Sequence, residues 1–164
     1  MASDRAASQP KKPLYTVEQR IRRDRSGWTL VQGALAPIQF LIFLVSLWLV
    51  VSYLATGEGF AAATVSVVVK TVALYAIMIT GAIWEKDVFG QYLFAEPFFW
   101  EDVFSMLVLA LHTAYLGALF FKLGTPAAQM TLALAAYAAY LVNAAQFVWK
   151  LRLARLESVR EARA

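Results

Sequence analysis

The sequence contains no cysteine and a single histidine, His112. The lack of cysteine excludes disulfide bonds, thiolate nucleophiles, and zinc or iron–sulfur centres that are held by thiolates. A lone histidine excludes a haem held between two histidines and a metal site built from several of them. The chemistry of this chain must therefore come from carboxyl, hydroxyl, amide and amine groups, or from one imidazole.

Charged residues are also scarce. They make up 16% of the 164 residues, whereas 60% are hydrophobic and the mean hydropathy is +0.58. Soluble domains carry about a quarter of charged residues. Four apolar runs, residues 31–55, 61–84, 99–121 and 127–149, each reach the roughly 20 residues that a membrane-crossing helix needs. Because the links between the runs are short, we expect an all-α membrane protein with four transmembrane helices in an up-down bundle.

The segments around these runs predict the orientation and the remaining parts of the chain. Lysine and arginine concentrate before the first run and after the last, so the positive-inside rule places both termini in the cytoplasm. We expect a disordered tail at residues 1–13, an interfacial amphipathic helix at 14–27 with a capping box at Thr16 and Gln19, a transmembrane domain at 28–157, and a tail at 158–164. The basic residues flank the spans and do not line a folded face, so we expect a lipid bilayer and no nucleic acid as partner.

Polar side chains recur inside the spans at helical spacing. Gln39 and Ser46 are seven residues apart in the first span, and Asn143, Gln146 and Lys150 share one face of the fourth. Buried polar groups are costly in lipid and face the interior of a bundle. Such stripes more often join helices than carry out chemistry, so contacts between helices are favoured over substrate contacts for Gln39, Ser46 and Asn143.

Two ionisable residues lie within the spans. For His112, two interpretations have equal weight: a hydrogen bond to a neighbouring helix, or one imidazole ligand for a metal whose other positions are filled by a macrocycle. Lys70 lies toward the outer end of the second span. We expect its side chain to extend toward the outer surface, as lysines near helix ends do.

The strongest functional signal is a cluster of acidic residues between the second and third spans. Residues 81–104 hold five of the eleven Asp and Glu residues of the chain. Among them, Glu85, Glu101 and Asp102 lie at the facing ends of two adjacent predicted helices, close to Trp84 and Trp100. Close carboxyl groups repel one another, and an apolar environment disfavours their charged form. Such a group can hold a proton at neutral pH, which predicts a general acid at the mouth of an apolar bundle.

Four longer stretches of the sequence resemble those of a known protein family. They read "WTLVQGALAPIQFLIFLVSL", "GAIWEKDVFG", "LFAEPFFWEDVFSMLVLALHTAYL" and "NAAQFVWKLRLARLE". Together they resemble the vinyl bacteriochlorophyllide hydratase family, membrane proteins of the bacteriochlorophyll pathway in phototrophic bacteria. The resemblance covers residues 14–157. It implies a carbon–oxygen hydro-lyase of the bacterial inner photosynthetic membrane that adds water to the 3-vinyl group of a chlorophyllide-type macrocycle and forms a 1-hydroxyethyl group.

The implied reaction needs an acid, a positioned water molecule and an apolar slot. We expect no cofactor, because the substrate carries its own magnesium. Either Glu101 or Glu85 is expected to be the acid, and the other carboxylate, with Asp102, to orient water and stabilise the cation. His112 is a candidate axial ligand for the substrate magnesium. The residues expected to contact the macrocycle are Trp84, Phe98, Phe99 and Trp100, together with Gln39 and Asn143.

Two other classes of protein stay open on the sequence alone. A pigment-binding or assembly subunit would copurify with a photosynthetic complex and convert no vinyl pigment. A small proton-coupled transporter would carry its ionisable residues near the middle of the membrane, whereas this chain concentrates them at one face. Beyond the tetrapyrrole and the bilayer, other enzymes of pigment synthesis are the expected partners.

Overall fold

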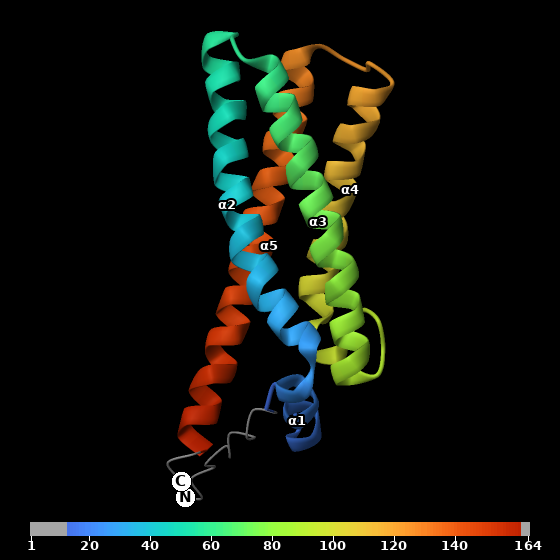
Figure 1. Cartoon of the computed structure of the whole chain (residues 1–164), viewed down its shortest axis with the longest axis vertical. Coiled ribbons are helices and arrows are strands. Elements are labelled where there is room, and N and C mark those ends of the chain that lie inside the picture. Colours follow the sequence, from blue (N-terminus) through green and yellow to red (C-terminus); the bar gives the residue numbers. More distant parts are fainter. Residues whose placement is uncertain (1–12, 162–164) are drawn as a thin grey trace, which may run out of the picture.

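The computed structural model describes residues 13–161, and the remaining parts of the two expected tails, residues 1–12 and 162–164, lie outside the described residues. Within the described range every regular element is helical, which confirms the expected all-α class. The elements are α1 (Val17–Arg25), α2 (Gly27–Thr56), α3 (Phe60–Phe89), the 3-10 turn η1 (Glu96–Phe98), α4 (Phe99–Phe120) and α5 (Pro126–Glu161) (Figure 1).

The long helices form the expected up-down bundle. α2 packs along α3, and α4 packs along α5. Residues 57–59 and 121–125 link helices at one end, while residues 90–95 link α3 to α4 at the other end, where α1 also lies (Figure 1). We call this second end the α1 end. The four helical segments that contain α2, α3, α4 and α5 are long and apolar enough to cross a membrane.

Two of the helices extend well beyond the apolar runs. α3 continues through Glu85 to Phe89 and stops where Gly90 adopts a φ of 87°, because a left-handed glycine ends a helix. α5 continues to Glu161. An apolar run marks the part of a helix that suits lipid, whereas capping and backbone hydrogen bonds decide where the helix itself ends.

A capping box starts α1, as the sequence predicts. The Thr16 hydroxyl accepts a hydrogen bond from the Gln19 N–H, and the Gln19 side chain accepts one from the Thr16 N–H. Tyr15, just before the helix, stacks on Phe89 with ring centroids 5.8 Å apart and contacts Phe98 at 6.3 Å. These contacts hold α1 against the end of α3. The position of α1 on a membrane surface stays a prediction.

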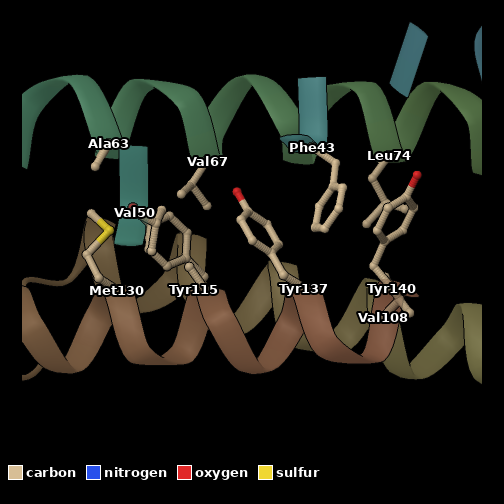
Figure 2. Packing of buried hydrophobic residues seen from close by; sticks show 11 residues of the cluster. Phe43, Val50, Ala63, Val67, Leu74, Val108, Tyr115, Met130, Tyr137 and Tyr140 are labelled. Carbon is tan, nitrogen blue, oxygen red and sulfur yellow. The ribbon is translucent and has the colours of Figure 1, made fainter. Parts of the chain in front are cut away.

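Aromatic and small side chains fill the bundle interior. Tyr137 and Tyr140 reach from α5 across the interior (Figure 2) and pack on Phe43 of α2, with ring centroids 5.4 and 5.0 Å apart. Ala63 and Ala133 are fully buried and let neighbouring helices approach closely. In the most apolar stretch of each span, 22–28% of the residues are buried within the protein. The remaining residues are half-buried or exposed, and the exposed ones suit contact with lipid tails.

Of the predicted polar stripes, Gln39, Ser46 and Asn143 are buried in the interior, and Ser46 and Asn143 join helices. The Ser46 hydroxyl pairs with those of Ser66 on α3 and Tyr137 on α5. Asn143 Nδ2 donates to Ser105 Oγ at 2.8 Å and so links α5 to α4. These bonds favour the interpretation of Ser46 and Asn143 as contacts between helices.

The expectation that Lys70 extends toward the outer surface is wrong. Its side chain is 0% exposed, and its Nζ lies 3.6 Å from the centroid of the Tyr140 ring. Among the described residues, this Nζ has no hydrogen-bond partner. Lys70 lies too far inside α3 to reach the helix end, and the face of the tyrosine ring takes the place of water.

Candidate active site

Two of the predicted acidic residues meet at the α1 end of the bundle. Glu85 lies about one turn before the end of α3, and Asp102 lies in the first turn of α4. Both side chains are buried, and their carboxyl groups are within hydrogen-bond reach of each other. An ionised carboxylate can only accept hydrogen bonds, so a hydrogen bond between the two groups requires that one of them is protonated. The geometry therefore favours one proton held between Glu85 and Asp102.

The link between α3 and α4 supplies two further hydrogen bonds to this pair. The Phe94 N–H donates to Asp102 Oδ2 at 2.7 Å, and the Ala95 N–H donates to Glu85 Oε2 at 3.3 Å. Phe94 has a φ of 60°, which is uncommon for a residue with a side chain. Backbone strain of this kind persists where the surroundings impose it, often at functional sites. Here it accompanies two donors that point at the acidic pair.

Glu101 has a different neighbour. Its Oε2 lies 2.5 Å from Nζ of Lys150 on α5, and the same ammonium group donates to the carbonyl of Pro97. Consecutive residues of an α-helix point about 100° apart, so Asp102 faces α3 while Glu101 faces α5. The three predicted acidic residues thus divide into two carboxyl groups in contact with each other and a single carboxylate in an ion pair.

A shallow groove opens beside Glu101 on the surface of α5. Its volume is about 510 Å³. It is lined by Glu101, Val142, Ala145, Gln146, Trp149, Lys150 and Leu153. A second groove, of about 370 Å³, is lined by Leu41, Ile42 and Val45 of α2 and by Ser66 and Val69 of α3, none of them charged. Of the two, the groove on α5 is lined by one of the acidic residues, Glu101, and is the candidate substrate site.

The four aromatic residues predicted to contact a macrocycle divide into two sets. Trp84 and Phe98 pack against each other inside the protein, with centroids 5.7 Å apart, and Trp84 Nε1 donates to Thr29 Oγ1 at 3.0 Å. Phe99 and Trp100 point outward in edge contact at 5.5 Å, and Trp100 is 66% exposed. The inner set has structural partners, whereas the outer set is open to a ligand or to lipid.

His112, Gln39 and Asn143 are buried farther into the bundle. His112 Nδ1 bonds to the Val108 carbonyl at 2.8 Å, and the ring packs on Tyr137. Because a carbonyl can only accept, Nδ1 carries the proton, and Nε2 has no partner in the described part of the chain. Glu101 and His112 are about 16 Å apart along α4. The structure does not bring His112 together with the acidic residues, and ligation of magnesium by His112 stays a prediction.

Sequence reasoning missed two parts of this site. It placed Lys150 on the polar face of the fourth span, but it did not pair this lysine with Glu101. It also left out the backbone donors of residues 94 and 95, which depend on the conformation of the link and have no signature in side-chain pattern. In residues 13–161, no group of three or more His, Cys, Asp or Glu side chains is arranged to hold a metal ion.

Comparison with known proteins finds relatives along almost the whole chain. The profile of a family described as 2-vinyl bacteriochlorophyllide hydratase matches residues 15–153. A 2-vinyl bacteriochlorophyllide hydratase from Cereibacter sphaeroides is 68% identical over 149 residues, which cover 90% of this chain and 92% of the relative. A protein of the same name from Rhodobacter capsulatus is 65% identical over 152 residues, which cover 92% and 88%. No solved structure matches the chain.

Proposed function

The chain belongs to the 2-vinyl bacteriochlorophyllide hydratase family, and from this membership we propose that it hydrates a vinyl tetrapyrrole with the acidic residues at its α1 end. Water adds across the vinyl group of a chlorophyllide or bacteriochlorophyllide and forms a 1-hydroxyethyl group. The vinyl position is numbered 2 or 3 according to the numbering system of the macrocycle. The enzyme is a hydratase, and we assign it to the carbon–oxygen hydro-lyases. The observation that carries the proposal is the contact between the Glu85 and Asp102 carboxyl groups.

The first step needs a proton donor. The proton held between Glu85 and Asp102 goes to the terminal carbon of the vinyl group, and the π electrons of the double bond form the new C–H bond. The resulting positive charge lies on the carbon beside the ring and is delocalised into the macrocycle. The carboxylate that the proton leaves behind stabilises this cation electrostatically.

In the second step, water attacks the carbon beside the ring. Glu101 lines the groove and is paired with Lys150, so we assign to it the orientation of this water and acceptance of the proton that the water loses. Return of that proton to Asp102, the next residue along α4, restores the starting state. One water molecule is added and no electron is transferred, so we propose that no resident cofactor takes part.

The substrate contacts and the cellular setting extend this proposal. We assign contact with the macrocycle to the outward Phe99 and Trp100, and support of the acidic residues to the inward Trp84 and Phe98. A role for His112 requires the ring to reach the bundle interior, and the same holds for the predicted substrate contacts of Gln39 and Asn143. We place the enzyme in the inner photosynthetic membrane of a bacterium, with both termini cytoplasmic and other pigment-synthesis enzymes as partners.

Substitution of the acidic pair tests the proposal. Membranes that contain Glu85→Gln or Asp102→Asn should hydrate a 3-vinyl chlorophyllide about 10²–10⁴-fold more slowly than wild type, because an amide cannot deliver the proton. The reaction is followed by the gain in mass of one water and by the blue shift that accompanies the loss of conjugation.

Glu58→Gln is the matched control. It makes the same chemical change at an exposed residue in the link between α2 and α3, at the opposite end of the bundle, and it should keep wild-type activity. Thermal unfolding establishes that all three variants are folded. Full hydration activity in both Glu85→Gln and Asp102→Asn would exclude this pair as the acid.

A further inference from the structure

We propose that Lys150 binds a free carboxylate of the pigment in the groove on α5, and so selects tetrapyrrole acids over their esters. This inference rests on the proposed hydratase function and adds the group of the substrate that is recognised and the residue that recognises it. Three features support it: the shape of the groove, the third N–H group of the Lys150 ammonium, and the free-energy cost of placing a carboxylate beside lipid.

The groove offers a flat apolar strip to the face of a macrocycle. Its α5 residues recur at intervals of three and four from Val142 to Leu153, so they form one continuous strip about 16 Å long. The small side chain of Ala145 leaves the middle of the strip shallowly hollowed, and Trp149 adds a broad aromatic surface. The volume of about 510 Å³ lies within the range of roughly 300–1,000 Å³ that is typical of small-molecule sites.

Lys150 has one hydrogen-bond donor left for a ligand. An ammonium group carries three N–H donors. In the described part of the chain, two form hydrogen bonds, with Glu101 Oε2 and with the carbonyl of Pro97, and the ammonium group also lies 5.2 Å from the centroid of the Phe98 ring. The side chain lines the groove and is 25% exposed. A carboxylate that enters the groove therefore meets a cation with a donor to spare, and a hydrogen bond between two charged groups is among the strong ones.

The position of this cation favours an anionic ligand group. A chlorophyllide carries a free propionate, whereas an esterified pigment does not. A carboxylate at the lipid boundary is costly unless a cation neutralises it. The ammonium group of Lys150 is already paired with Glu101, but its further N–H can donate a charge-assisted hydrogen bond to the acid, which offsets part of this cost and offers no comparable gain to the ester. The groove between α2 and α3, which has no charged lining residue, cannot make this distinction.

A charged anchor also fixes how the ring lies. A flat ring on an apolar strip can slide and rotate, because hydrophobic contacts are non-directional. A carboxylate held at Lys150 places one edge of the ring beside the start of α4, where Glu101 and the Glu85–Asp102 pair lie. Lys150 is thus a positioning and specificity-determining residue and not the proton donor.

The test compares a 3-vinyl chlorophyllide with its methyl ester, using the full chain in lipid vesicles. Wild type should hydrate the acid with a kcat/KM about 10- to 100-fold above that of the ester. Lys150→Gln should bring this ratio close to one, mainly by raising KM for the acid, whereas Lys150→Arg should keep most of it. Any loss that arises through Glu101 affects both substrates and leaves the ratio unchanged.

Lys122→Gln is the control, since Lys122 is exposed in the link between α4 and α5, far from the groove; both rates should stay as in wild type. As a second readout, Glu85→Gln, which blocks turnover, should bind the acid more tightly than the ester in a titration followed by pigment absorption. Equal use of acid and ester by wild type, or an unchanged ratio in folded Lys150→Gln, would overturn the inference and leave the hydratase function standing. Failure of wild type to hydrate either pigment would contradict the proposed function itself.

Discussion

Lys70 places a polar nitrogen in an apolar interior, against the ring of Tyr140 and with no hydrogen-bond partner among the residues described. A buried polar group without a hydrogen bond costs about 1–3 kcal/mol in folded proteins. The contact with the tyrosine ring offsets part of this cost. The side chain therefore opposes the stability of the bundle that surrounds it.

Replacement of Lys70 by methionine should stabilise the protein. Met keeps the length of the side chain and a favourable sulfur contact with Tyr140, and it removes the buried polar group. We expect the free energy of unfolding to rise by about 1 kcal/mol, measured as a higher Tm in detergent micelles. The exposed Lys122, changed to Met, should leave Tm within error of wild type. A lower Tm for Lys70→Met would show that the nitrogen has a favourable partner inside the bundle, such as water or an ion.

Sequence reasoning identified the three acidic residues but not their pairing. Glu85 meets Asp102, whereas Glu101 meets Lys150. Because neighbouring residues of a helix point about 100° apart, a rotation of α4 by that angle would turn Glu101 toward α3 in place of Asp102. That rotation is set by the packing of α4 on α3 and α5, which a local pattern does not encode. The periodic stripes of Gln39, Ser46 and Asn143 were easier to interpret, because burial alone determines their direction.

At the scale of the element, Tyr15 anchors α1 to the bundle through Phe89 and Phe98. Loss of a buried aromatic ring costs about 3–5 kcal/mol. We expect Tyr15→Ala to weaken the docking of α1 by that order and to speed cleavage by trypsin at the arginines of α1, since cleavage requires local unfolding. The fragments are followed by mass spectrometry.

The matched control for this experiment is Tyr92→Ala, which removes an exposed ring from the link between α3 and α4. It should leave the rate of cleavage in α1 unchanged. Equal rates for Tyr15→Ala and wild type would mean that other contacts, such as the hydrogen bond from Ser26 to Asp87, are sufficient to hold α1.

The existence of the long helices followed from the sequence, but their ends did not. Four apolar runs of spanning length leave few alternatives, because the backbone must satisfy its own hydrogen bonds in lipid. The ends depend on other features. α3 runs on past Trp84 to Phe89 because its stop signal is the left-handed Gly90, and hydropathy does not report it. The turn at Phe94 could not be predicted from the sequence either, because its positive φ occurs at a residue other than glycine.

At the scale of the whole molecule, the orientation in the membrane can be tested because the chain lacks cysteine. A single thiol can be introduced by Ser158→Cys at the α1 end or by Glu58→Cys at the opposite end. With both termini cytoplasmic, a membrane-impermeant maleimide should label Glu58→Cys in intact spheroplasts and Ser158→Cys after the membrane is opened. Cysteine-free wild type gives the background. The reverse order of labelling would contradict the predicted topology.

The groove on α5 looks outward, since Val142, Trp149 and Leu153 are all exposed along it. A pigment that docks there enters from the side and leaves by the same route without crossing water. The pigment then reaches and leaves the enzyme by diffusion in the plane of the membrane. The quantity that governs turnover is the mole fraction of pigment among the surrounding lipids, and the volume of the cytosol does not enter into it.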